Sequence, residues 1–219
     1  MGQADPAFST PVGIIPVGTG NSFAKDLGIH SFETGVETIC QGNTRSVDLG
    51  HCEYEGGSYY FINVLGFGFA ADVAKGAVAY KRFGSLSYVI SLFSVVRNLS
   101  FYRLQLGIDG RTYERENCFV EICNSTKTGG DMIIAPDAQI DDGLLDVIVL
   151  NKISRTRLLH AFPRIYKGSH LELPEVESFK ASQISVKSSI PKTCTPDGEV
   201  LGQTPLELKV CPGQITLFA

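Results

Sequence analysis

Residues 103–123, RLQLGIDGRTYERENCFVEIC, carry the strongest structural signal in the sequence. Two strand-like stretches, Arg103–Ile108 and Thr112–Cys123, flank the dipeptide Asp109-Gly110. Asp-Gly favours the tight turn of a β-hairpin, because both central positions of that turn need positive φ angles. The segment therefore predicts two antiparallel strands. Strand patterns of this kind dominate the sequence from Arg45 onward.

The sequence on both sides repeats this β pattern. Ser46–Glu53 and Tyr59–Val64 flank Gly56-Gly57 and predict a second hairpin. Leu144–Leu150 is apolar apart from one aspartate, and leucine and valine alternate with charged residues over 206–210. Alternation with a period of two is typical of a strand with one buried and one solvated face. Residues 45–219 therefore predict a mostly antiparallel β domain.

Two or three helices are expected within this mostly β architecture. Ser85–Leu99 has apolar residues at helical spacing, which predicts a helix with one face toward the core. Another begins at Ser154 and should end or kink at Pro163, because proline cannot donate the backbone hydrogen bond of a helix interior.

The first forty residues are of a different, α/β type. Val12–Ile15 is a short apolar run, and a glycine-rich turn follows it. One helix is expected from about Ser22, taken as its N-cap, to Leu27, and a second over about Thr34–Cys40, ending at Gly42. This strand, loop and helix fragment is too short to form a domain by itself.

Composition excludes several classes of protein. With 43% hydrophobic and 19% charged residues in 219, the chain can bury a core and is not disordered. Its net charge of −4 argues against a nucleic-acid partner. The six cysteines include no C-x-x-C pair, so we expect reduced thiols and a cytoplasmic protein. The N-terminus MGQADPAFST has no signal-peptide pattern, and Leu86–Val96 is too short to span a bilayer, so any membrane contact is expected to be peripheral.

A glycine-rich loop lies within residues 11–28, PVGIIPVGTGNSFAKDLG. A loop between a strand and a helix start directs backbone N–H groups toward one point, which suits a phosphate. Gly13–Thr19 has the glycine spacing of a P-loop but lacks its lysine, so the segment is not a Walker A site. From the residues alone, a structural turn and a nucleotide site both remain open.

This loop resembles the nucleotide-loop motif of the diacylglycerol kinase, sphingosine kinase and bacterial lipid kinase superfamily. The matching residues are Pro16, Gly18, Thr19, Asn21, Phe23 and Ala24. The resemblance implies that ATP is the co-substrate, that Thr19 contacts it, and that Gly18 and Asn21 belong to the same site.

Phe61–Val89 resembles the family segment that runs from a Gly-Phe-Gly strand end into a helix. The resemblance implies that Asp72 binds the lipid head group and that Lys81 and Arg82 approach the phosphates of the nucleotide. The residues alone also allow purely structural roles: Asp72 could be a helix N-cap, and Lys81 and Arg82 could lie at a solvated helix end.

Gly129–Leu150 resembles the family signature G-G-x-x-x-x-P-x-A-x-x-D-D-G-x-L-D-V. The resemblance implies Mg²⁺ held by the Asp142 carboxylate and the backbone carbonyls of Gln139 and Leu144, and hard oxygen ligands suit that ion. An acidic β-turn without metal is the alternative. Gly129-Gly130-Asp131 is similar to part of the superfamily's G-G-D-G nucleotide motif, but it lies in the wrong part of the chain, and we assign it no role.

The turn Pro196-Asp197-Gly198-Glu199 resembles the family's D-G-E element. The resemblance implies that Asp197 and Glu199 lie at the cleft between domains and abstract a proton or contact nucleotide and metal. A base that takes the proton of a lipid hydroxyl would prepare it to attack the γ-phosphate. Asp197 and Glu199 are two residues apart, so their side chains would face the same side if the segment were extended. A plain hairpin turn is the alternative, and it is compatible with that role.

The resemblance runs from Pro11 to about Pro212, but the family's strand–GGDGT–helix element does not precede Pro11. We therefore divide the chain into a tag-like or disordered lead (1–10), a remnant of the nucleotide-binding α/β domain (11–44) and a lipid-kinase β domain (45–219). The resemblance implies that this last domain is antiparallel and β-sandwich-like. The resemblance allows the last strand of the β domain to return to the α/β remnant.

The sequence thus predicts part of an ATP- and Mg²⁺-dependent lipid kinase that transfers a γ-phosphate to a lipid hydroxyl at a membrane surface. It is expected to be weak or inactive without the nucleotide half. One alternative is a non-catalytic β domain that binds lipid or a partner. Another is an active kinase assembled with a separate N-terminal polypeptide or as a homo-oligomer. The acceptor stays open, because the Asp72 segment favours a sphingoid lipid and the acidic turn favours diacylglycerol.

Overall fold

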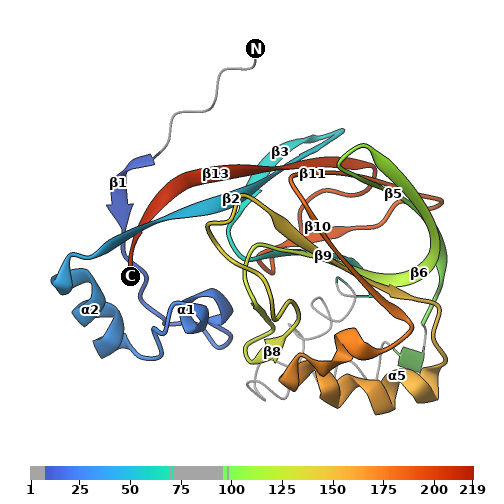
Figure 1. The fold of residues 1–219 in the computed structure, drawn as a ribbon, viewed down its shortest axis with the longest axis horizontal. Helices are drawn as coiled ribbons and strands as arrows, with labels where there is room; N and C mark the ends of the chain where they lie inside the picture. The colour runs from blue at the N-terminus through green and yellow to red at the C-terminus, as the bar shows by residue number, and fades with distance from the viewer. Residues whose placement is uncertain (1–7, 70, 72–95, 98) are drawn as a thin grey trace.

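The computed structural model describes residues 8–69, 71, 96–97 and 99–219 (Figure 1). Its main feature is one strongly curved sheet with the path β10-β9-β6-β5-β11-β13-β2-β3, to which β4 and β12 are added beside β6 and β1 beside β13. The strands are β1 (Phe8–Val12), β2 (Thr44–Tyr54), β3 (Gly57–Phe61), β4 (Val64–Gly68), β5 (Tyr102–Ile108), β6 (Arg111–Cys123), β9 (Leu145–Asn151), β10 (Val176–Ala181), β11 (Gln183–Ser188), β12 (Cys194–Pro196) and β13 (Leu206–Phe218).

A small hairpin and a few short helices complete the described part. The hairpin is β7 (Lys127–Thr128) with β8 (Met132–Ile133). The helices are α1 (Ser22–Asp26), α2 (Phe32–Gln41), α5 (Arg155–Ala161) and the 3₁₀ segments η2 (Phe162–Lys167) and η3 (Ser169–Glu172). The predicted fold class, a mostly antiparallel β-sandwich-like structure with few helices, is confirmed. Among the described residues, no helix combines the length and hydropathy that crossing a membrane requires.

Both predicted hairpins form. Strands β5 and β6 pair up to Ile108 and Arg111, and the turn residues Asp109 and Gly110 have φ angles of 44° and 82°. These positive angles are the ones that the Asp-Gly pair was expected to supply. The second hairpin joins β2 and β3, with Tyr54 opposite Gly57.

Helix starts agree less well with the predictions. Helix α1 is capped by Asn21, with φ 53°, so the assignment of Ser22 as N-cap was wrong. Helix α2 begins at Phe32, earlier than expected, because the Ser31 hydroxyl accepts the Thr34 N–H in a capping box. Helix α5 starts after Ser154 as predicted and continues as η2 beyond Ala161. Most of the helix predicted over Ser85–Leu99 lies outside the described residues.

The two faces of the curved sheet bury different clusters. The concave core is purely strand-made and includes Phe61, Phe67, Leu104, Val120, Ile184 and Leu208. The other face of β4, β6 and β9 packs toward α5, η2 and η3 through Val64, Ile148, Leu158 and Ile165. The candidate site lies on this second face.

The last strand links the β domain to the N-terminal segment. Strand β13 pairs antiparallel with β2 as far as Phe218 and parallel with β1, so α1, α2 and β1 gather at one end of the molecule (Figure 1). Phe23, Val47, Ile140 and Leu217 form a small apolar cluster there. Strand β1 begins at Phe8, inside the expected lead, and the division at residues 10 and 44 stays a prediction.

Candidate functional site

A cavity of about 680 Å³ lies between the glycine loop, the D-G-E turn and the sheet face beneath α5. Its polar lining residues include Thr19, Asn63, Glu121, Thr195, Asp197 and Glu199. Its apolar lining residues include Phe119, Ile148, Leu150, Ile153, Leu158 and Phe162. This volume is within the usual range for small-molecule sites. The structure therefore brings the glycine loop and the D-G-E turn, far apart in sequence, to one site.

The glycine loop is closed by its own asparagine. The Gly18 N–H donates to Asn21 Oδ1 at 3.0 Å, and Asn21 Nδ2 donates to the Gly18 carbonyl at 2.7 Å. A Cβ at position 18 would lie 2.9 Å from Asn21 Oδ1, so a larger residue there would displace the Asn21 side chain from these hydrogen bonds. Asn21 thus maintains the shape of the loop, while Thr19 is exposed on it and lines the cavity. Of the three predicted loop residues, Thr19 is the one placed to contact a ligand through its side chain.

The carboxylate of Asp197 is committed to the backbone of a neighbouring loop. Its oxygens accept the N–H groups of Ile62 at 2.9 Å, Asn63 at 2.9 Å and Val64 at 3.1 Å. Burial raises the pKa of Asp197, and these three hydrogen bonds oppose the rise. These three hydrogen bonds attach the D-G-E turn to the loop that leads into β4.

Glu199 has different surroundings. The segment is not extended, because Asp197 and Gly198 take φ angles of 47° and 89° and the Glu199 N–H donates to the Pro196 carbonyl at 2.8 Å. Glu199 is exposed and lines the cavity. The turn therefore presents one carboxylate to the cavity and uses the other to fix its position.

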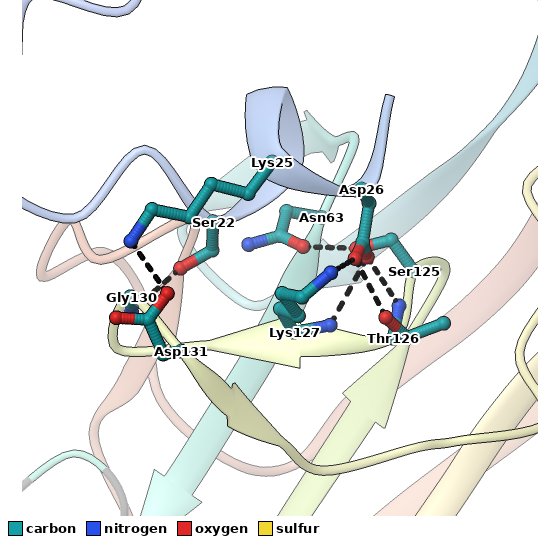
Figure 2. Close-up of polar contacts among 9 residues, drawn as sticks. All are labelled: Ser22, Lys25, Asp26, Asn63, Ser125, Thr126, Lys127, Gly130 and Asp131. Atoms are coloured by element: carbon teal, nitrogen blue, oxygen red, sulfur yellow. Dashed lines mark hydrogen bonds and ion pairs between the residues drawn. The ribbon is translucent and has the colours of Figure 1, made fainter. Parts of the chain in front are cut away.

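Helix α1 is fastened to the β7–β8 hairpin by a buried carboxylate, shown in Figure 2. Asp26 Oδ2 accepts the N–H groups of Thr126 at 2.7 Å and Lys127 at 3.1 Å. Asp26 Oδ1 accepts the Thr126 hydroxyl and the Lys127 ammonium, both at 2.6 Å. We call this group the Asp26 latch. It fixes α1, and with it the glycine loop, against the β domain.

The turn of the same hairpin makes a second contact with α1 (Figure 2). The Gly130 N–H donates to Ser22 Oγ at 2.8 Å, and Lys25 pairs with Asp131 at 2.7 Å. Gly129 and Gly130 also line the cavity. Sequence reasoning gave Gly129-Gly130-Asp131 no role, and no local signal could have found one, because the contact spans about a hundred residues of chain.

Replacing Asp26 with alanine should lower the free energy of unfolding by about 2–4 kcal/mol, because it leaves the Lys127 charge and two backbone N–H groups without their acceptor. Urea unfolding measures this loss. Asp131→Asn is the matched control: its ion pair is largely exposed, so we expect a change of about 0.5 kcal/mol or less. Equal effects of the two variants would contradict the latch.

The acidic turn expected to hold Mg²⁺ is engaged by protein groups. Asp142 Oδ1 accepts the Leu144 N–H at 3.0 Å, and its Oδ2 lies 3.3 Å from Lys180 Nζ. Lys180 also contacts Asp146 at 3.1 Å. A divalent cation on Asp142 would have to displace this ammonium, so the donor set as it stands does not fit the ion. The described residues contain no cluster of three His, Cys, Asp or Glu suited to a metal. The site at Gln139, Asp142 and Leu144 stays a prediction.

Asp48, which sequence reasoning missed, holds this turn in place. It is buried, and its carboxylate accepts the N–H groups of Gly143 and Gly213, each at 2.7 Å. The Asp48 N–H donates to the Ile140 carbonyl at 2.7 Å. The sequence did contain a signal for this role, because Asp48 lies inside a predicted strand. A carboxylate that is buried in a strand needs hydrogen-bond donors nearby.

Glu121 was also missed, and it is the buried carboxyl of the cavity. It is 5% exposed, and its Oε1 accepts the Thr128 hydroxyl at 2.8 Å. Burial raises its pKa to about 7, and the Thr128 hydrogen bond opposes this rise. In the sequence it is a single glutamate inside an apolar strand. Asp72, Lys81 and Arg82, the other predicted site residues, lie outside the described residues.

The raised pKa of Glu121 makes stability depend on pH. Its ionisation in the folded state is penalised, so the cost is absent below about pH 4.5, grows as the pH rises, and is complete above about pH 7. Glutamine at position 121 has no such cost. The difference in unfolding free energy between Glu121→Gln and wild type should therefore rise by roughly 3 kcal/mol, in favour of the variant, from pH 4.5 to pH 8. Urea unfolding at both pH values measures it, with exposed Glu114→Gln as control. A gain independent of pH would contradict the assignment.

The amino-acid sequence is similar to known proteins over most of its length. The sequence profile of the diacylglycerol kinase catalytic domain matches residues 2–52, and that of the YegS C-terminal NAD kinase β-sandwich-like domain matches residues 63–219. A diacylglycerol kinase of Mycobacterium tuberculosis is 30% identical over 213 residues, which cover 95% of this chain and 69% of that relative. One of Bacillus subtilis is 26% identical over 200 residues, covering 90% and 65%.

Solved structures share the fold. A crystal structure of a diacylglycerol kinase from Bacillus anthracis str. Sterne, 20% identical, superposes with a TM-score of 0.68 over 95% of this chain and 66% of its own. Another from the same organism, 25% identical, gives 0.77 over 95% and 69%. The family resemblance is thereby confirmed. By its sequence matches, its β-sandwich-like fold and the joining of the glycine loop to the D-G-E turn, this chain belongs to the diacylglycerol kinase family of lipid kinases.

Proposed function

We propose that this chain provides the acceptor-lipid side of a kinase that transfers the γ-phosphate of ATP to the hydroxyl of an acyl-bearing lipid. The observation that carries the proposal is the single cavity that joins the polar groups of the glycine loop and the D-G-E turn to an apolar interior. A lipid needs both kinds of surface at once: polar groups for the reacting hydroxyl and an apolar enclosure for the acyl chain. Family membership supplies ATP as the co-substrate.

In this proposal the lipid hydroxyl lies at the D-G-E turn. Glu199 accepts its proton as the oxygen attacks the γ-phosphorus, and the bond to the oxygen bridging the β- and γ-phosphorus atoms breaks, so ADP leaves. Thr19 contacts the nucleotide from the glycine loop, and Asp197 fixes the turn. A divalent cation bound with ATP would neutralise phosphate charge.

The apolar interior takes the acyl chain. Phe119, Ile148 and Leu150 come from the sheet, and Leu158 and Phe162 come from α5 and η2. Burying apolar area is worth about 25 cal/mol per Å², so a long acyl chain gains several kcal/mol there. We infer peripheral contact with a membrane surface, from which such a lipid would enter.

The experiment is transfer of labelled phosphate from ATP and Mg²⁺ to mixed micelles of diacylglycerol, monoacylglycerol, sphingosine or ceramide. It is run with the chain alone and with the nucleotide half of a relative added in trans. Transfer in either arm that is lost in Glu199→Gln supports the proposal, and the second arm tests the separate-half hypothesis. Lipid binding without transfer in both arms would instead favour the non-catalytic lipid-binding alternative.

A further inference from the structure

The Glu121 carboxyl lies where the polar and apolar parts of the cavity meet. In register across four adjacent strands, Thr195 is opposite Gly66, Gly66 is opposite Glu121, and Glu121 is opposite Ile148. Thr195, Glu121 and Ile148 all line the cavity. Gly66 lies between Thr195 and Glu121 in this row and has no side chain of its own.

The neighbouring positions along the strands define what lies on each side of this row. Toward the D-G-E turn, the next position on β4 is Val64, whose carbonyl accepts the Asp197 N–H at 2.8 Å. In the other direction, β6 and β9 present Phe119 and Leu150 to the cavity. Two residues along a strand span about 6.6 Å. A lipid with its hydroxyl at the turn and its chain on Phe119 therefore passes Glu121 with the atoms next to its reacting hydroxyl.

Half of the Glu121 carboxyl has no protein partner among the described residues. The Thr128 hydroxyl donates to Oε1, and no described group donates to Oε2. A carboxyl buried in an apolar sheet face destabilises the fold when ionised, and its pKa of about 7 reflects that cost. Buried ionisable groups that face a cavity in this way are typical of binding sites.

We propose that Glu121 is a specificity-determining residue that selects lipids with a second hydrogen-bond donor, a hydroxyl or an amine, beside the hydroxyl that receives the phosphate. This inference rests on the proposed function. A carboxylate only accepts hydrogen bonds, so it suits a free hydroxyl or an ammonium group and opposes the ester carbonyls of a diacylglycerol. A monoacylglycerol and a sphingoid base both meet the requirement.

The test is equilibrium binding, because it needs no nucleotide. A fluorescent fatty-acyl probe is displaced from the full chain at pH 8 by 1-oleoylglycerol, which has two free hydroxyls, or by 1-oleoyl-2-acetylglycerol, which has one. We expect 1-oleoylglycerol to bind more tightly by about ten- to a hundredfold, the range for a hydrogen bond to a charged group. Glu121→Leu should abolish this ratio, and Glu121→Gln should keep part of it, because a neutral acceptor binds more weakly.

The control is Glu114→Leu, an exposed glutamate on the same strand, which should keep the wild-type ratio. Because the readout is a ratio for two lipids on one variant, a general loss of stability would not produce the expected pattern. Displacement by both lipids with a ratio that Glu121 variants do not change would overturn this inference and leave the proposed function standing. If neither lipid displaced the probe, both this inference and the proposed function would be overturned.

Discussion

Glu199→Gln is expected to lower phosphate transfer to lipid by about two to four orders of magnitude while leaving the fold unchanged. The reduction is the usual contribution of a positioned general base, since glutamine cannot take the hydroxyl proton. Glu199 is exposed and the described residues give its side chain no partner, so the free energy of unfolding should move by about 0.5 kcal/mol at most.

Initial rates of transfer, measured beside urea unfolding in the better of the two assay arms, check this prediction. Glu207→Gln, an exposed glutamate on β13 away from the cavity, is the control and should keep full activity. If Glu199→Gln kept more than a third of the wild-type rate, the proton would have another acceptor, and the roles assigned to the D-G-E turn would be wrong.

Asp197→Ala should act on the fold and lower the free energy of unfolding by about 1–3 kcal/mol. The change leaves the N–H groups of Ile62, Asn63 and Val64 without their acceptor, and of these three residues only Val64 is buried. Asp197→Asn keeps one carbonyl oxygen and should lose roughly half as much.

Urea unfolding of the two variants gives this graded series directly. Asp197→Ala will also lose activity, so the rate alone cannot separate bracing from chemistry. The order of the unfolding free energies can separate them: wild type should be the most stable, Asp197→Asn intermediate and Asp197→Ala the least stable. An alanine variant as stable as wild type would show that the three N–H groups do not depend on Asp197, and would return this residue to the list of groups free for catalysis.

The parts of the fold that followed from sequence are those fixed by local chemistry. Asp109-Gly110 specifies its hairpin because only a few residue pairs tolerate two positive φ angles in succession. Ser154 and Gly42 mark helix ends through their own capping groups. Alternating residues near position 208 predicted a strand, and the family resemblance allowed the last strand to return to the remnant, but the bulge between Cys211 and Ile215 was not predicted.

The candidate site was only partly accessible by the same reasoning. Family motifs located Thr19, Asp197 and Glu199, but they treated the two carboxylates as equivalent, and only the long-range hydrogen bonds to β4 separate them. The Asp26 latch and the Gly130 contact join segments about a hundred residues apart, so no local pattern encodes them. Glu121 is conspicuous only after its strand is known to face a cavity.

In the proposed function, one cavity holds both the reacting hydroxyl and the acyl chain. Photolabelling with a monoacylglycerol that carries a diazirine midway along its chain tests this most directly, by mass spectrometry of peptides from the intact chain. We predict that the label falls on β9, α5 and η2, within Leu145–Lys167, and that excess unlabelled lipid prevents it. Label spread over the outer strands, or unaffected by competing lipid, would contradict the claim.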